Sequence, residues 1–566
     1  MRRERGVGFG RIGLGLALSA LACAAPPTGP EAEPVAQARE SRCATEALGS
    51  LQLLSLHRYA RQTAPNPVAS EEDFDEDDVA ILLDRGDLII RRNLFDLESA
   101  GLRFTPNRNR GYDVARLSLA LGSPGTALPV ATGGATAVDL PFPFPFFDRT
   151  WDRAFVQSDG SVAFGAADAG AGEPGLARFL GGPARVAGFF SSLDPTRGGS
   201  VSALVQSDRV TVQWSRVPGG GQRNRNTFEV TLRPTGIVDL VFGPEMQTRE
   251  GLVGLSPGAT RELAAADLSL SRPSGTAGAI AERFSESEKA DLVSVASRFL
   301  AGHPDVSDQL VIYTSRPLNP LPGSLAFEVN VRNEVEGIGL ELFDHSAEWS
   351  SGGALHSVAY MDSIDAYLDV DGFEILAHEV GHRWLARLQF RQGTNPPSGA
   401  LLGRAALHWS FFFDTDASVM EGNLIADRGN GRFETVDITQ GYSPLDQYVM
   451  GLRLPREVPP FFYVEQPDNF RPNRGFKASS SPEAGIAFTG VRRDVTIEDV
   501  VAALGPRTPA ATLAPRLLRQ AFILVADAAA PATPPRRQAL ARIRRHFGPY
   551  YREATGGRGT ADSTLP

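Results

Sequence analysis

The sequence predicts a multidomain protein in which an all-β sandwich precedes an α+β domain with a helical C-terminal subdomain. Between residues 102 and 272, short runs of alternating apolar and polar residues are separated by turns rich in Gly and Pro, which is typical of β-sandwiches. From residue 282 to 550, helical and strand-like patterns follow one another instead. The chain has 566 residues, of which 42% are hydrophobic, and this is enough for several domains with their own cores.

The N-terminus has the pattern of an export signal. A basic start precedes a small apolar run from Val7 to Ala22, so residues 1–23 are predicted to be a secretory signal peptide. Its end, Ser19-Ala-Leu-Ala-Cys23, resembles the box of bacterial lipoproteins, which implies a lipid on Cys23 and a membrane anchor. Simple secretion and an uncleaved anchor are the alternatives. We therefore expect an exported bacterial-type protein, either a lipoprotein of the outer membrane or cell surface, or a secreted one.

The segment before the sandwich is predicted to be a linker followed by a small structured region. Residues 24–42 are rich in Pro, Ala and Glu, which is typical of a tether. Residues 43–101 are predicted to hold a helix and a hairpin, with the hairpin at 79–90. Cys43 is the second of only 2 cysteines, so no disulfide framework is predicted and this thiol is expected to be idle. The net charge of −10 gives no reason to expect a nucleic-acid partner.

The strands predicted between residues 102 and 272 carry the patterns of a known exported module. Residues 210–214 and 228–232 alternate apolar and polar side chains, as half-buried strands do. Several short motifs resemble nidogen-like sandwich modules, namely Phe144-Pro-Phe-Phe147, Ser158-Asp-Gly-Ser161, Ala187-Gly-Phe-Phe190, Asp194-Pro195 and Thr235-Gly-Ile237. The resemblance implies an accessory or binding module.

The domain at 282–550 is predicted to begin with a helix at Ser285–Leu300 and to continue with strands. The predicted strands are Gln309–Tyr313, Ala326–Val331, Gly337–Phe343 and Ser357–Met361. Helices are predicted at Pro515–Ala526 and Pro534–Phe547, the second with a basic, solvated face. The acidic run at 70–78 is expected to be a solvated loop, and residues 551–566 are expected to be a tail.

A pair of histidines inside the stretch Phe373–Leu388 indicates a metal site. Apolar residues recur there at helical spacing, so we predict one helix. His378 and His382 are four residues apart and share one helix face, so both imidazoles can bind one ion. Glu379 lies about 100° round the helix, too far to be an equal ligand but able to reach a water on that ion. The alternative is an ordinary helix with two exposed histidines, although the chain has only 8 histidines.

The His378-Glu379-x-x-His382 motif and its apolar flanks resemble the zincin metallopeptidases. The resemblance implies a zinc ion, a hydrolase reaction and Glu379 as the base that deprotonates the zinc-bound water. It also implies a metal helix behind a twisted sheet, with peptide substrate along an edge strand. We expect that edge to be Gly337–Phe343 or Ser357–Met361.

A third ligand is needed, because catalytic zinc takes three protein ligands and one open position. The compact metzincin form is absent, since its Gly and His positions hold Leu385 and Leu388. His408 follows instead, and Ser418-Val-Met420 resembles the metzincin Met-turn, so we favour a metzincin-like arrangement with an insertion before His408. Carboxylate alternatives remain open at Asp414, Asp416, Glu421 and Asp446.

The residues around Asp446 also have a structural interpretation. Ser443-Pro-Leu-Asp446 is typical of a helix start with a capping box. Tyr442 or Tyr448 could donate to an oxyanion, although packing roles are favoured. Residues 427–431 hint at calcium, but a Gly-Asn-Gly turn explains them without a bidentate Glu. Together, the motifs from residue 274 onward also resemble immune-inhibitor-A-type peptidases.

The sequence thus predicts an exported zinc endopeptidase with a protein or peptide substrate. The alternative is a surface lipoprotein that binds through its sandwich and carries a structural or inactive zincin domain. Neither the cleavage specificity nor the oligomeric state follows from these patterns.

Overall fold

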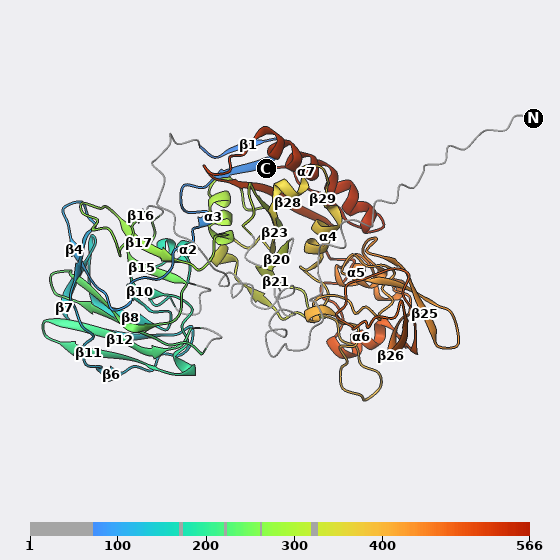
Figure 1. The fold of residues 1–566 in the computed structure, drawn as a ribbon, viewed down its shortest axis with the longest axis horizontal. Coiled ribbons are helices and arrows are strands. Elements are labelled where there is room, and N and C mark those ends of the chain that lie inside the picture. Colours follow the sequence, from blue (N-terminus) through green and yellow to red (C-terminus); the bar gives the residue numbers. More distant parts are fainter. Residues whose placement is uncertain (1–71, 169–173, 220–222, 261–262, 319–325, 566) are drawn as a thin grey trace, which may run out of the picture.

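The computed structural model has three parts, with the sandwich at one end, a central α/β domain and a small β-rich subdomain at the other end (Figure 1). It describes residues 72–168, 174–219, 223–260, 263–318 and 326–565. The predicted signal peptide, the linker, Cys23 and Cys43 lie outside these residues.

The central domain is built on a seven-stranded sheet in which most neighbouring strands are parallel. The order is β1-β2-β28-β19-β23-β20, and β29 also pairs with β28. Two pairs in this sheet, β1 with β2 and β20 with β23, are antiparallel. The strands are β1 (Phe74–Glu76), β2 (Val79–Leu83), β19 (Gln309–Thr314), β20 (Phe327–Asn330), β23 (Ser357–Ser363), β28 (Leu517–Ala526) and β29 (Thr560–Asp562).

Helices cover both faces of this sheet, because its strands are apolar on both sides. Val311 and Tyr313 of β19 pack in one core with α4 (Phe373–Gly381) and α7 (Pro534–Ala554). Leu310 and Ile312, which point the other way, pack in a second core with α3 (Leu292–Gly302). Parallel strands buried on both faces are expected to be apolar throughout. Helix α4, which carries His378 and Glu379, therefore packs against one face of the sheet.

The predicted helix at 515–526 is wrong, since this segment is strand β28 in the middle of the sheet. Its run from Ala521 to Ala526 is fully buried, and it pairs with β19 on one side and β2 on the other. Because this part of β28 is buried on both faces, its residues are apolar throughout and do not alternate with polar ones. Such a run does not distinguish a strand from a helix. The predicted tail also takes part, because β29 pairs with the start of β28.

Three further predictions in this domain need correction. The 79–90 hairpin does not form, because β2 pairs with β1 and β28, whereas β3 (Ile89–Ile90) pairs with β18 (Lys289–Ala290). The first helix starts later than residue 285, because Asp291 caps it by accepting from the Ser294 amide at 3.2 Å. The predicted strand at 337–343 is mostly irregular, with only β21 (Arg332–Asn333) and β22 (Phe343–Asp344) nearby.

The sandwich is an insertion in the central domain, because β1 and β2 precede it in the chain and α3 follows it. The two crossing segments pair with each other as β3 and β18. Arg91 in the first segment bonds Asp84 and Glu288, each at 2.7 Å, and Asp527 at 2.9 Å. Arg316 bonds the same Glu288 and Asp527. This ion-pair network ties both crossings to the end of β28.

Two seven-stranded antiparallel sheets form the sandwich around one aromatic-rich core, apart from one parallel pair at an edge. At the Ser158–Ser161 turn, Gly160 has φ +81° and a Cβ there would lie 2.1 Å from the Phe189 carbonyl oxygen, so the motif needs glycine. The sandwich extends past residue 272, the end expected from the sequence, because β17 pairs with β15. One sheet contains β16 (Leu263–Ala265), β17 (Ala279–Phe284), β15 (Gly251–Ser256), β10 (Arg185–Phe190), β9 (Ser161–Phe164), β8 (Arg149–Gln157) and β7 (Ala135–Phe146). The other contains β5 (Tyr112–Leu117), β4 (Gly101–Pro106), β14 (Val238–Met246), β13 (Asn226–Leu232), β12 (Arg209–Val217), β11 (Ser200–Gln206) and β6 (Thr126–Ala127), and the short α2 (Leu176–Gly181) packs beside β10.

The basic face of α7 is not merely solvated, because acidic residues from two other segments pair with it. The acidic run before β2, expected to be a solvated loop, supplies several of these partners. The pairs are Arg536–Asp365, Arg537–Glu76, Arg542–Asp371, Arg544–Asp78 and Arg545–Asp77. Strands β1 and β2, which precede the sandwich in the chain, are therefore part of the central domain.

The C-terminal subdomain is a sheet with short helices and not the helical unit predicted. Its sheet has the order β24-β25-β27-β26 and packs on a phenylalanine-rich core. The elements are β24 (Asn423–Asp427), β25 (Arg432–Ile438), β26 (Phe461–Arg471), β27 (Ala487–Val495), α5 (Pro444–Val449) and α6 (Ile497–Leu504).

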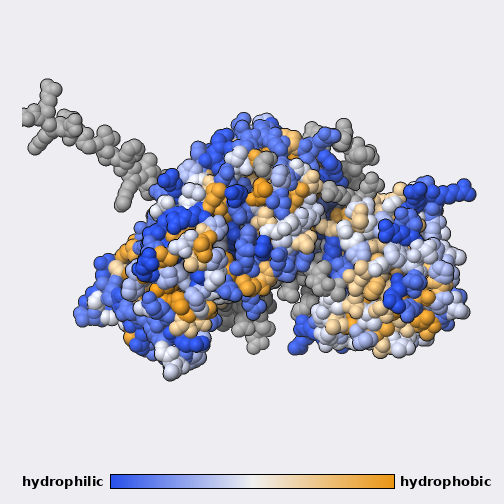
Figure 2. Space-filling view, turned by 180° about the vertical axis from the view of Figure 1, so that it is seen from behind, coloured by the Kyte–Doolittle hydropathy of each residue, from blue (hydrophilic) through white to orange (hydrophobic). Residues whose placement is uncertain are grey.

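Figure 2 shows hydrophilic residues spread over one face of the molecule, with hydrophobic residues between them in small groups. Within the described ranges, every helix is too short or too polar to traverse a lipid bilayer.

Candidate metal centre

The metal motif lies on α4, which is shorter than predicted. The helix covers Phe373–Gly381 and ends with His382 as its C-cap, well before Leu388. Leu376, Ala377 and Val380 face the core and are fully buried. After the helix, the amides of Trp384 and Leu385 both bond the Gly381 carbonyl oxygen at 2.9 Å, so one further turn follows before the chain leaves the helix axis. His378 and His382 remain one turn apart on the same face.

The structure brings the two helix histidines together with His408, the favoured third ligand. The Nε2 atom of His378 lies 3.0 Å from Nε2 of His382 and 3.2 Å from Nε2 of His408. Within the described residues, these three form the one group of His, Cys, Asp or Glu side chains whose ligand atoms all lie within 4.8 Å of one another. Three histidines are therefore close enough to bind one metal ion.

Backbone carbonyl groups orient all three rings. Nδ1 of His378 lies 2.9 Å from the Val419 carbonyl oxygen, and Nδ1 of His408 lies 3.0 Å from that of Arg404. Nδ1 of His382 makes a longer contact of 3.4 Å with the Leu385 carbonyl oxygen. Because a carbonyl oxygen only accepts, each Nδ1 is assigned the proton. Each Nε2 then presents a lone pair to the other two, as in metal sites whose ligands are oriented by backbone groups.

Burial keeps these imidazoles neutral. It lowers the pKa of His378, and it lowers those of His382 and His408 well below the ordinary value, with further contributions from the neighbouring histidines and Arg404. Neutral imidazole is the form that binds metal. A tetrahedral ion about 2.0–2.1 Å from each nitrogen would hold the nitrogens about 3.3 Å apart, close to the observed 3.0 and 3.2 Å. The donor set therefore fits a metal ion.

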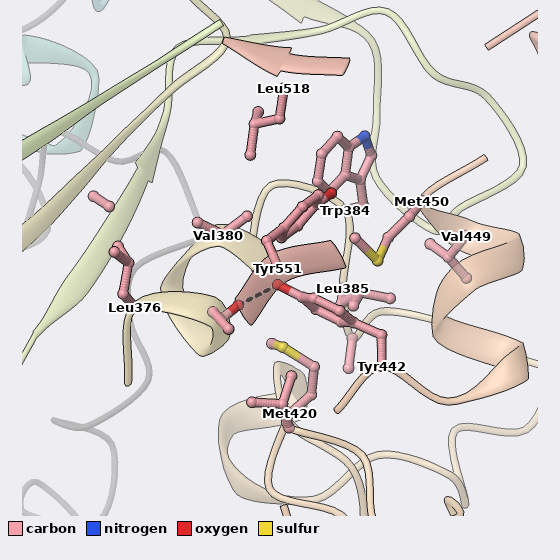
Figure 3. Packing of buried hydrophobic residues seen from close by; sticks show 14 of the residues in the cluster. Leu376, Val380, Trp384, Leu385, Met420, Tyr442, Val449, Met450, Leu518 and Tyr551 are labelled. Carbon is pink, nitrogen blue, oxygen red and sulfur yellow. Dashed lines mark hydrogen bonds between the residues drawn. The ribbon is translucent and has the colours of Figure 1, made fainter. Parts of the chain in front are cut away.

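The predicted Met-turn packs under the end of α4. A Cβ placed on Gly381 would lie 2.4 Å from Sδ of Met420, so a larger residue here would require the Met420 side chain to move. Ser418 supports the turn by accepting from the Met420 amide at 3.1 Å. Figure 3 shows Met420 and Tyr442 together beside α4. Since Val419 in this turn also accepts from His378, the turn positions a ligand as well as the helix.

Buried polar groups from outside the motif hold the His382 end of the helix. The His382 carbonyl oxygen accepts from Nδ2 of Asn330 on β20 at 3.2 Å and from Nη1 of Arg387 at 3.0 Å. A cation here complements the negative end of the helix dipole. Burial lowers the pKa of Arg387 to about 10. Strand β20 and the segment after α4 are thus fixed relative to the second ligand.

The carboxylate alternatives for the third ligand lie outside the histidine cluster. Asp446 caps α5, accepting from the Ser443 amide at 2.7 Å and from Nε1 of Trp409 at 2.9 Å. Asp414 accepts from the Ile425 amide, Asp416 is exposed, and Glu421 pairs with Arg404. None of these carboxylates therefore belongs to the histidine cluster: two accept hydrogen bonds from the protein, one is exposed and one pairs with an arginine.

The other candidate residues have structural roles. Tyr442 is buried and donates to the Ala377 carbonyl oxygen at 2.5 Å (dashed line in Figure 3). The Tyr448 hydroxyl accepts from the Arg507 amide at 3.1 Å. Both hydroxyl groups therefore bond backbone atoms of the protein. This agrees with the packing roles that were favoured over donation to an oxyanion. Asp427 accepts from the Gly429 amide in the β24–β25 turn and lies outside the metal-ligand group found among the described residues.

Glu379 lies between the two helix histidines and is 6% exposed. It is not part of the histidine cluster, in keeping with its place round the helix. Burial raises the pKa of Tyr367, and the charge of Glu379 raises it further. This interaction places Tyr367 near the carboxylate.

Sequence reasoning missed Arg404, Asn330 and Arg387. Arg404 precedes His408 by four residues, a spacing that could have drawn attention to it. Its Nη2 lies 3.1 Å from Nε2 of His408. Asn330 and Arg387 gave no such signal, because their contacts with His382 depend on the folded chain.

Comparisons with known proteins identify one part of the chain. Residues 119–294 match the family model described as NIDO related, which agrees with the nidogen-like resemblance. The match covers the sandwich from β6 to β17 and runs on into the start of α3. No curated protein and no solved structure matches the chain. The chain thus carries a NIDO-related domain next to a domain with three converging histidines.

Proposed function

We propose that the protein is a zinc-dependent endopeptidase of the zincin type. One observation carries the proposal: three imidazoles, two of them buried, present their Nε2 atoms to a common point, directly beside Glu379 on α4. Three imidazole ligands suit zinc, and catalytic zinc sites use three protein ligands. A metzincin-like helix, a third histidine and a Met-turn support the same assignment.

The reaction follows from the groups around the cluster. Zinc in such a site lowers the pKa of a bound water to about 7 and polarises a carbonyl group. His378, His382 and His408 hold the ion as neutral ligands. Glu379 takes a proton from the attacking water and returns it to the amine nitrogen that leaves, so that a peptide and water give a carboxylic acid and an amine.

The substrate binds along β20 in this proposal, which replaces the edge strand expected from sequence. Strand β23 is not an edge, because it pairs with β19 and β20. Strand β20 ends the sheet order and runs antiparallel to β23. Its Asn330 contacts the His382 carbonyl group, so a peptide extended along this edge would run toward the metal ligands.

The experiment is the substitution Glu379→Gln, with zinc content and peptide cleavage measured on the same preparation. The variant should keep one equivalent of zinc and lose at least about a hundredfold in kcat, the contribution of a general base. Glu374→Gln on the exposed side of the same helix should keep both. A Glu379→Gln variant that cleaves at the parent rate would refute the mechanism.

Export and a lipid on Cys23 complete the proposal and rest on the N-terminal sequence. A second candidate function is a surface lipoprotein that binds a partner through its sandwich, favoured by the NIDO-related match. Zinc analysis separates the two. Stoichiometric zinc with cleavage stopped by a chelator supports the enzyme, and partner binding by a zinc-free protein supports the binding module.

A further inference from the structure

A guanidinium group lies beside the metal ligands. Nη2 of Arg404 is 3.1 Å from Nε2 of His408, the nitrogen that also lies 3.2 Å from Nε2 of His378. The contact is made on the side of the ring that carries the lone pair, because Nδ1 of His408 bonds the Arg404 carbonyl oxygen. Arg404 therefore reaches the point where the three histidines converge.

The backbone accepts a costly conformation to place this arginine. Arg404 begins a short 3-10 helix that ends at Ala406, and both Ala405 and Ala406 have positive φ values, 51° and 58°. Residues other than glycine pay for such conformations, and these are found preferentially at functional sites. The same short segment delivers the Arg404 side chain, the Arg404 carbonyl group and the His408 ring to one place.

Glu421 holds the guanidinium in position. Nε of Arg404 donates to Oε2 of Glu421 at 3.1 Å, and Nη2 pairs with Oε1. Both side chains are largely buried, with 16% and 19% of their side-chain surfaces exposed. Glu421 directly follows the Met-turn, so the two structures that position His378 and His408 also position Arg404.

A metal ion and Arg404 cannot share the lone pair of His408. When an ion takes that lone pair, Nη2, which also pairs with Glu421, lies beside the ion with an N–H group that no longer bonds His408. An anionic oxygen between a metal ion and a guanidinium is stabilised by both, most strongly where water is excluded.

We propose that Arg404 is a catalytic residue that binds the anionic oxygen of the substrate on the open side of the three histidines. In turnover, this oxygen is that of the scissile carbonyl group as it gains negative charge. The inference rests on the proposed function for its substrate. Its basic claim, an anion site built from Arg404 beside a metal ion, does not need the peptidase activity.

The test compares Arg404→Met, Arg404→Lys and Glu421→Gln in the full chain. Zinc affinity is measured by competition with a chelating dye, and inorganic phosphate affinity by calorimetry on the zinc-loaded protein. Removing the Arg404 charge should tighten zinc binding about tenfold and weaken phosphate binding about tenfold or more. Glu421→Gln, which leaves the arginine charge unbalanced, should weaken zinc binding. Arg404→Lys keeps the charge and should bind phosphate within about fivefold of the parent.

Opposite changes in zinc affinity, tighter in Arg404→Met and weaker in Glu421→Gln, distinguish this role from that of a purely structural ion pair. If the Arg404–Glu421 pair only held the loop, Arg404→Met and Glu421→Gln would both weaken zinc binding. That outcome, or parent-like phosphate binding by Arg404→Met, overturns the inference. Arg428→Met removes an exposed Arg–Glu pair in the β24–β25 hairpin and should change neither affinity.

Peptide cleavage supplies an independent readout. Loss of an oxyanion donor costs about a hundredfold to a thousandfold in kcat, so Arg404→Met should lower kcat and leave KM little changed. A loss confined to KM would overturn the catalytic role. A parent protein that binds zinc and phosphate but cleaves no peptide would refute the proposed function while supporting the anion site.

Discussion

Asp446 gives a prediction whose size can be worked from its contacts. Its carboxylate is fully buried, and it accepts from the Ser443 amide at 2.7 Å and from Nε1 of Trp409 at 2.9 Å. In Asp446→Asn, one oxygen can serve one of these donors, and the amide NH2 group must then face the other. A buried donor without an acceptor costs about 1–3 kcal/mol, so we expect a loss of about 2 kcal/mol in the free energy of unfolding.

Asp446→Ala removes both acceptors and the helix cap. The two buried donors left unsatisfied, one of which makes the capping bond from the Ser443 amide, predict a loss of about 2–6 kcal/mol. Because Asp446 is not a metal ligand in this account, folded Asp446→Asn should bind zinc like the parent. One of the two donors, Nε1 of Trp409, belongs to the residue after His408, so Asp446 links the cap of α5 to the segment that carries the third histidine.

The assay is guanidinium unfolding of the metal-free protein, followed by tryptophan fluorescence, with a parallel zinc titration. Asp494→Asn is the control, because its side chain is 63% exposed and its exposed ion pair should contribute less than about 1 kcal/mol. Asp446→Asn that is as stable as the parent would refute the capping argument. A folded Asp446→Asn that loses zinc would restore this carboxylate as a ligand.

Two further predictions concern the sandwich and the N-terminal strands. Burial raises the pKa of Glu282 on β17 to about 7, above its unfolded value, so its stabilising contribution is complete below pH 4.5 and is lost as the pH rises through 7. Glu282→Gln turns an amide group toward one of the two donors on these oxygens, Nδ2 of Asn93 and the Leu268 amide, but it does not titrate. The stability of the parent relative to this variant should therefore fall by up to about 3 kcal/mol between pH 5 and pH 8, measured by denaturant unfolding at both pH values; a difference that stays the same would contradict this. Ile81→Ala in β2 empties a fully buried site and should destabilise the central domain by about 2–5 kcal/mol, whereas Leu513→Ala, 79% exposed, should not. A parent-like Ile81→Ala would mean that the segment before the sandwich is not integral to the central domain.

Local patterns predicted the grouping of the three histidines, which lie close enough to bind one metal ion. The His378–His382 spacing needs only one helical turn, so its geometry is contained in the local sequence. The capping box at Ser443 and Asp446 is equally local and was predicted with its residues in the right places. His408 was favoured only by its position before Met420, and the structure brings it to the other two histidines.

Features that depend on long-range pairing could not be predicted in the same way. Strand β28 looked helical because its apolar run is buried on both faces, a property of neighbours distant in sequence. The acidic run before β2 and the basic face of α7 were each expected to be solvated, yet they pair across more than 450 residues of chain. Arg404 was missed because its contact with His408 depends on the backbone conformation of the short 3-10 helix at residues 404–406.

The measurement that tests the central claim most directly is a zinc titration of the full chain and of His408→Ala. The parent should bind one equivalent of zinc tightly, and His408→Ala should bind it about a hundredfold more weakly or worse, because only two imidazoles remain. His303→Ala is the control, since His303 pairs with Asp75 instead. Parent-like zinc affinity in His408→Ala would contradict the three-histidine centre on which the proposed function rests.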